Sequence, residues 1–302
     1  MPPTMSRMGD VLAGFHAAWE FESDSVLIRF ERGIRTPKLF QALGERRIPH
    51  EAIAAVTLSP GKRGTVVLHA VPRPGADPLM EAAAGQLKDG CDPYRLVLPA
   101  ERETLAEYYA DELRAQLTSA DSEPTDRYLV AAPEAPLQFK AYDGKASFDG
   151  KLVSFRWFWT GASSAKWKAG DQSFPITDLC GIEWRSPEIF EGHLRLLPRE
   201  APVTRPGQAD QDPAAVVFGL GYGPVHESLP FAASVLAAVR ASGPALLTPE
   251  GGVATSAATT PAVRRDPADI AERIRHLGEL HQAGLITDEE FTAKKAELLA
   301  EL

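Results

Sequence analysis

Cysteine is scarce in this chain, which contains only Cys91 and Cys180 among 302 residues. Two cysteines cannot build the disulfide framework of small secreted domains, and neither has a Cys or His neighbour at the spacing of a metal ligand. No stretch reaches the 18 consecutive apolar residues that suggest a membrane-spanning helix. The first residues also lack the basic start and apolar stretch of a signal peptide. We therefore expect a cytoplasmic protein that contacts a membrane only peripherally, if at all.

Positive charge is also in short supply, with 32 Lys and Arg against 41 Asp and Glu and a net charge of −9. A surface of that sign disfavours nucleic acid, whose binding depends on phosphate neutralisation by cations. The seven histidines are scattered and belong to no hydrolase or metalloprotease motif. We expect no enzymatic activity, no catalytic residues, no cofactor and no metal.

The chain does contain an internal repeat, which organises its first 240 residues. Phe21–Phe30 aligns without gaps on Phe148–Trp157, and both segments read as a turn followed by a strand. Ile53–Val56 then parallels Leu179–Ile182 at almost the same offset. Each copy continues through a Pro/Gly/Ala-rich insertion to an Asp-Pro pair and another strand. The repeat is therefore about 110 residues long.

Each copy ends in a segment with helical periodicity, over residues 101–117 and 227–240. The first predicts one apolar face, made of Leu105, Tyr108, Tyr109, Leu113 and Leu117. Several strands followed by one helix, with no helix between the strands, favour antiparallel sheets over a βαβ arrangement. We predict a mainly β fold with some α structure (α+β).

The repeat resembles an uncharacterised, mostly bacterial family, domain of unknown function 4429. The resemblance rests on Phe21 and Phe148 with their acidic turns, on residues 44–49 (Gly-Glu-Arg-Arg-Ile-Pro), and on the ending with its insertion and Asp-Pro strand. It implies two pleckstrin-homology-like domains, over residues 8–118 and 127–241. Each would be an antiparallel barrel or sandwich closed by one C-terminal helix.

Residues 242–265 have the Gly, Pro, Ala, Ser and Thr composition of a flexible linker. In residues 266–302, Asp266-Pro267 begins one helix, and Thr287 with Glu290 forms a capping box for a second. Together they predict a helical hairpin with nine acidic and four basic residues.

The hairpin resembles the short C-terminal domain, SHOCT, through Leu280–Phe291, Lys294-Lys295 and Leu298-Leu299. Members of that family are thought to act in oligomerisation or as interaction modules. A domain below about 40 residues rarely buries enough apolar surface to be stable alone. We expect self-association or docking through its apolar residues, Ile274, Leu277, Leu280, Leu285, Ile286, Phe291 and Leu298.

Six basic residues gather within nineteen positions of the first repeat, opposed only by Glu31 and Glu45: Arg29, Arg32, Arg35, Lys38, Arg46 and Arg47. One hypothesis is a patch for an anionic lipid or an acidic partner, since pleckstrin-homology-like folds can hold phosphorylated headgroups near their early strands. The alternative is an ordinary solvated loop. In the second repeat, residues 157–168 combine Trp and Lys, which fits a core strand with one exposed ring, a partner surface or a surface on which nucleic-acid bases stack.

These observations predict a non-enzymatic adaptor. The hairpin would mediate homo-oligomerisation or docking, and the tandem domains would bind a protein or peptide. Weak contacts joined by a flexible tether would reinforce one another through avidity. The alternative function is peripheral binding of anionic lipid through the basic loop of the first repeat.

Overall fold

The structure is a computed structural model that describes residues 10–117, 123–189, 191–199, 207–219 and 221–243. These residues form two copies of one plan, within a single compact unit. Each copy has a four-stranded sheet, a three-stranded sheet and a long closing helix, and the strands pair antiparallel. The predicted α+β class is confirmed. Within the described residues, no sheet closes into a barrel.

The first repeat carries its strands in the sheet orders β1-β2-β3-β4 and β5-β6-β7. Its elements are β1 (Asp10–Ala13), β2 (Ala17–Phe21), β3 (Ser25–Phe30), α1 (Lys38–Leu43), β4 (Glu45–Pro49), β5 (Ile53–Pro60), β6 (Thr65–Pro72), α2 (Pro78–Ala83), β7 (Arg95–Pro99) and α3 (Glu103–Gln116).

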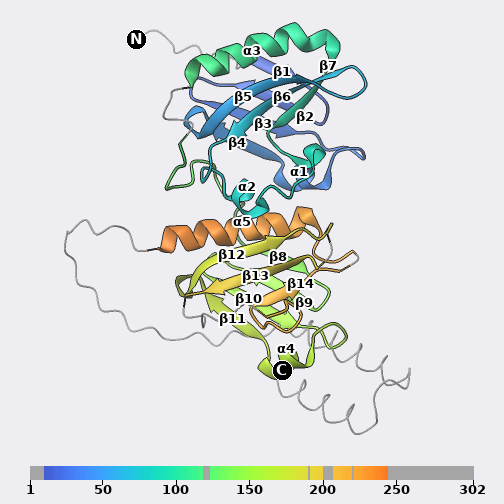
Figure 1. Ribbon diagram of the computed structural model, residues 1–302, viewed down its shortest axis with the longest axis vertical. Helices are drawn as coiled ribbons and strands as arrows, with labels where there is room; N and C mark the ends of the chain where they lie inside the picture. The colour runs from blue at the N-terminus through green and yellow to red at the C-terminus, as the bar shows by residue number, and fades with distance from the viewer. Residues whose placement is uncertain (1–9, 118–122, 190, 200–206, 220, 244–302) are drawn as a thin grey trace, which may run out of the picture. The chain divides into compact units, whose positions relative to one another are not determined.

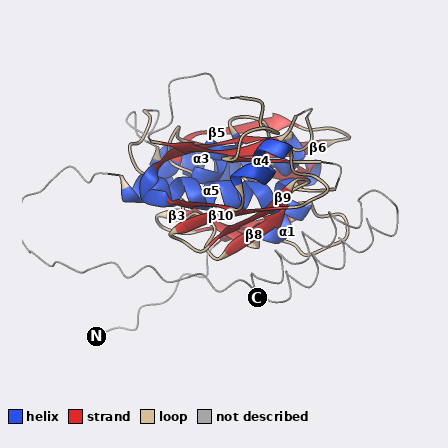
Figure 2. Cartoon of the chain, turned by 90° about the horizontal axis from the view of Figure 1, so that it is seen from below, coloured by secondary structure: helices blue, strands red, loops and turns tan. Residues whose placement is uncertain are grey.

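The second repeat follows the same order, with sheets β11-β10-β9-β8 and β12-β13-β14. Its elements are β8 (Leu137–Lys140), β9 (Gly144–Phe148), β10 (Leu152–Trp157), α4 (Ser164–Ala169), β11 (Gln172–Pro175), β12 (Leu179–Arg185), β13 (His193–Pro198), β14 (Ala215–Val217) and α5 (Val225–Ser242). In the view of Figure 2 the strands lie on two sides, and α3 and α5 overlap in the middle. Figure 1 shows that each of these helices runs across one end of the strands of its own repeat.

Alternating apolar residues build the core of the first repeat. Val26 of β3 pairs with Ile48 of β4, and both side chains are fully buried. Leu68 and Leu96 of the three-stranded sheet belong to the same cluster. Helix α3 closes this core because Tyr109 stacks on Phe21, with ring centroids 4.2 Å apart.

The predicted apolar face of α3 is partly wrong. Tyr109 and Leu113 are buried, but Leu105 and Tyr108 are exposed. The buried stripe runs instead through Ala106, Tyr109, Ala110 and Leu113, because the small alanines let the helix approach the sheets closely.

Helix α5 differs from α3 in being buried on almost every side. Nine of its residues are buried, including every residue from Ser228 to Val235. A helix that is apolar all round needs cover on all sides, so something besides its own sheets must lie against it. No helix of the described residues is both long and apolar enough to cross a membrane.

Candidate functional site

Helix α2 of the first repeat provides the additional cover for α5. It packs against α5 and also contacts β12, as Figure 1 shows for the α2–α5 pair. Leu79, Ala82 and Ala83 of α2 join the buried cluster of the second repeat, which includes Leu229 and Val235. The Pro/Gly/Ala-rich insertion of the first repeat therefore contains a docking helix.

Gln86, three residues beyond α2, binds the open edge of the second repeat. Its side-chain nitrogen donates to the carbonyl oxygen of Trp184 at 3.0 Å, and its side-chain oxygen accepts from the amide of Ser186 at 2.9 Å. Strand β12 is the edge of its sheet. The carboxamide therefore bonds the free backbone groups of this edge as a neighbouring strand would.

Charged side chains flank this contact on both sides. Nη2 of Arg240 on α5 donates to both carboxylate oxygens of Glu81, at 2.8 and 3.0 Å, and the guanidinium lies over the Tyr128 ring, 3.9 Å from its centroid. Burial, together with Glu81, raises the pKa of the Tyr128 hydroxyl. Lys88 pairs with Glu188 at 3.0 Å. Sequence analysis did not find this interface, although the absence of charge between Leu229 and Val239 is a signal for it.

The first repeat contains the equivalent of the groove that α2 and Gln86 occupy. Continuing the alignment of Ile53 with Leu179 places Leu58 opposite Trp184 and Pro60 opposite Ser186. The strand registers agree, because Leu58 pairs with Leu68 as Trp184 pairs with Leu194. Strand β5, like β12, lies at the edge of its sheet.

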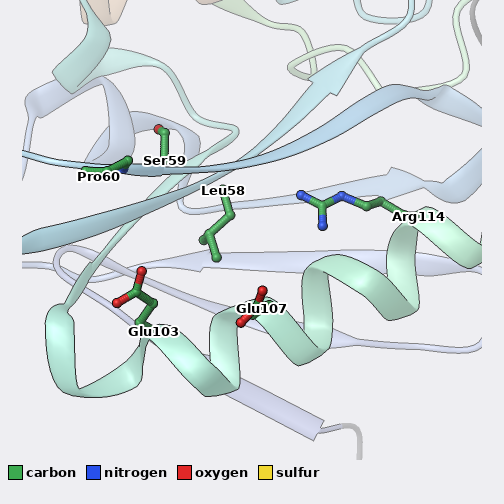
Figure 3. A pocket seen from close by; sticks show the side chains of 6 residues that line it. All are labelled: Leu58, Ser59, Pro60, Glu103, Glu107 and Arg114. Atoms are coloured by element: carbon green, nitrogen blue, oxygen red, sulfur yellow. The ribbon is translucent and has the colours of Figure 1, made fainter.

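In the first repeat this groove is an open cavity of about 240 Å³ between β5 and α3. Figure 3 shows Glu103, Glu107 and Arg114 on α3 facing the strand that carries Leu58, Ser59 and Pro60. We call this cavity the β5–α3 groove. Arg114 donates to the Val56 carbonyl at 3.0 Å and pairs with Asp111 at 2.7 Å.

The β5–α3 groove offers mainly hydrogen-bond acceptors. Among the described residues, no ion pair involves Glu103 or Glu107. Pro60 has no N–H group, so the donor that Ser186 supplies in the second repeat is missing here. Because backbone groups two residues apart face the same edge of an antiparallel strand, the carbonyl of Leu58 faces this edge together with that of Val56.

The six basic residues of the predicted patch for an anionic ligand do not form one surface. Arg29 pairs with Glu20, and Arg47 pairs with Glu22. Arg32 and Arg35 lie on the β3–α1 loop, and Lys38 begins α1. All three are exposed, and none has an ion-pair partner among the described residues.

Arg46 is buried and therefore does not belong to an exposed patch. Its guanidinium donates to Asp77 at 2.8 Å and to the hydroxyl of Tyr94 at 3.1 Å, and Tyr94 donates to Asp77 at 2.5 Å. Burial opposes the charge of Arg46, but Tyr94 and Asp77 outweigh it and raise its pKa. Burial also raises the pKa of Tyr94. Because Asp77 caps α2 through the Leu79 amide, this network holds the docking helix to the core.

The Trp-rich segment of the second repeat divides between core and surface. Trp157 is buried, whereas Trp159 is 39 % exposed and meets Trp167 edge to face at 4.9 Å. Lys166 is buried and pairs with Asp143. Burial lowers the pKa of Lys166 and raises that of Asp143.

The predicted hairpin residues, from Ile274 to Leu298, lie outside the described residues. Among the residues that are described, no three His, Cys, Asp or Glu side chains form a cluster that could hold a metal ion.

Comparison with known families agrees with the two repeats. The family described as domain of unknown function DUF4429 matches residues 19–114 and 146–236, which run from β2 to α3 and from β9 to α5. The short C-terminal domain SHOCT matches residues 272–299, so both resemblances noted in the sequence are confirmed. No curated protein matches the chain. Because the two DUF4429 segments cover more than half of its 302 residues, the chain belongs to the DUF4429 family and carries two tandem copies followed by a SHOCT domain.

Proposed function

We propose that this protein is a non-enzymatic cytoplasmic adaptor. The two repeats bind a protein or peptide partner, and the SHOCT domain brings copies together or docks on another protein. Each repeat is of the pleckstrin-homology-like type, which the combination of a four-stranded sheet, a three-stranded sheet and a closing helix supports.

One observation carries the proposal. The groove between the edge strand and the closing helix of the second repeat already holds a foreign segment, formed by α2 and Gln86. The repeat therefore combines a backbone edge, which any extended or amide-bearing segment can bond, with an apolar helix face that adds buried area. A fold that binds a segment in this way within its own chain is suited to binding one from another chain.

The test is a pull-down of the intact protein from the cytoplasm of its own source cell, compared with a variant lacking residues 266–302. We expect partners that the intact chain captures and the variant loses or holds weakly, and a lower mass in solution for the variant. An intact chain that is monomeric and captures nothing would contradict the adaptor function.

A second candidate is supported by the loop between β3 and α1. Hydrogen bonds from the Thr36 amide and the Gln41 side chain to the Gly33 carbonyl hold a turn whose tip is the fully exposed Ile34. Arg32 and Arg35 flank this tip. An apolar tip between cations suits the surface of an anionic bilayer.

Sedimentation with phosphatidylserine vesicles tests this candidate. We expect salt-sensitive binding that Arg32→Ala with Arg35→Ala abolishes. Lys151→Ala with Arg185→Ala removes the same charge from exposed positions of the second repeat and serves as the control. Equal binding to neutral phosphatidylcholine vesicles, or no binding to either, would exclude recognition of anionic lipid by this loop while leaving the adaptor function intact.

A further inference from the structure

We propose that the β5–α3 groove of the first repeat binds an arginine-bearing segment of a partner protein. This inference rests on the proposed function and specifies its site and the chemistry of its ligand. The guanidinium of the bound arginine lies between Glu103 and Glu107 and donates to the carbonyl oxygen of Leu58.

The location follows from the comparison of the two repeats. In the second repeat, the backbone groups of Trp184 and Ser186 are bonded by Gln86, and α2 covers the adjoining face of α5. The equivalent positions in the first repeat are Leu58 and Pro60, and they line an open cavity. The chain thus shows one copy of this groove occupied and the other available.

The chemistry of the ligand follows from the residues that differ between the grooves. Tyr109 of α3 contacts Phe21, and Phe231 of α5 makes the equivalent contact with Phe148. This equivalence aligns the two closing helices. In the alignment, Glu107 takes the place of Leu229, and Arg114 takes the place of Leu236. The buried Leu229 suits the apolar α2 helix, whereas a carboxylate at the same place does not. The first groove is therefore unsuited to a copy of α2.

A cationic hydrogen-bond donor matches the carboxylates and the backbone carbonyl that line the β5–α3 groove. Since Pro60 cannot donate, a carboxamide placed like that of Gln86 would lose one of its two hydrogen bonds. Arg114 is already bonded to Val56 and Asp111, and within the described part of the chain neither Glu103 nor Glu107 has an ion-pair partner. Arginine presents five donors and no acceptor, so it can bond a carboxylate and a backbone carbonyl together.

The experiment is a selection from a displayed library of random heptapeptides on the intact protein, followed by affinity measurement with the enriched peptides. We expect an arginine at one fixed position. Replacing it with glutamine, or combining Glu103→Gln with Glu107→Gln, weakens binding by about tenfold or more, since each charge-assisted bond contributes strongly. The amide NMR signals that shift on binding belong to Leu58, Ser59 and α3.

Glu101→Gln with Glu112→Gln removes the same charge from exposed positions outside the groove and leaves affinity unchanged. Glu103→Lys with Glu107→Lys reverses the charge of this pair, so that selection on this variant enriches acidic peptides in place of basic ones. Enriched peptides without arginine, or binding that Glu103→Gln with Glu107→Gln leaves intact, would overturn the inference. If the pull-down still captures partners through another surface, the adaptor function survives that result.

Discussion

The side-chain amide of Gln86 donates to the carbonyl oxygen of Trp184, a residue 98 positions further along the chain, at 3.0 Å. This bond joins the insertion of one repeat to the edge strand of the other. The packing of α2 on α5 adds to this bond. The second repeat therefore depends on a segment of the first repeat to bury its closing helix.

Gln86→Ala should lower the free energy of unfolding by about 1–3 kcal/mol, because it leaves the carbonyl of Trp184 and the amide of Ser186 without partners. Chemical denaturation of the intact protein measures the change. Gln116→Ala is the matched control, since Gln116 is an exposed residue at the end of α3. Equal stability of the two variants would mean that water replaces both bonds at no cost.

Leu79→Ala should destabilise the protein by about 2–5 kcal/mol, the usual range for a fully buried leucine that leaves a cavity. Because Leu79 belongs to the buried cluster of the second repeat, the loss should appear there also. Hydrogen exchange of α5 amides is the direct readout. Faster exchange confined to the first repeat would show that α2 does not stabilise α5.

Arg46→Ala and Arg47→Ala should behave differently although they are neighbours. Removing Arg46 leaves the buried Asp77 without its cation and should cost about 3–5 kcal/mol. Removing Arg47 breaks an exposed pair and should cost about 0–1 kcal/mol. Thermal unfolding of both variants makes the comparison. Similar losses would contradict the buried network of Arg46, Asp77 and Tyr94.

Acidification should destabilise the protein through two partly buried histidines. Burial lowers the pKa of His50, although the negative charge of Asp24 acts to raise it. Burial also lowers the pKa of His226; Glu227 acts to raise this pKa, and the positive charge of Lys38 lowers it further. The unfolded chain then binds more protons, so this stabilisation is complete above the unfolded pKa of about 6.5 and is lost as pH falls toward the folded value.

Chemical denaturation between about pH 7.5 and about pH 5.5 tests this effect. His50→Gln with His226→Gln should flatten the pH dependence relative to the intact chain. A slope that does not respond to these two substitutions would assign acid sensitivity to other groups.

Much of the fold could be predicted from local patterns. The alignment of Phe21–Phe30 with Phe148–Trp157 located β3 and β10, and the helices predicted at 101–117 and 227–240 lie within three residues of α3 and α5 at each end. The short helices α1, α2 and α4 were not predicted. Each has six residues, too few for a periodic apolar pattern to stand out.

The candidate site could not be predicted in the same way, and the basic patch shows why. Six cations close in sequence look equivalent, yet Arg46 is buried because Asp77 and Tyr94, 31 and 48 residues away, meet it inside the fold. The β5–α3 groove likewise brings Leu58 together with Glu103 and Glu107, although β6, α2 and β7 lie between them in the sequence.

Local sequence patterns were enough to predict the repeat, the antiparallel α+β plan and the family, because hydrophobic periodicity and turn residues act over short stretches of chain. Which charges face solvent, which groove is filled and which is open became visible only in the folded chain. Those outcomes depend on contacts between residues far apart in the sequence. A buried polar group is stabilised when such a contact supplies a hydrogen-bond or ion-pair partner, and it is destabilising when none is supplied. Gln86 is the clearest case, since its role exists only where β12 presents an unpaired edge.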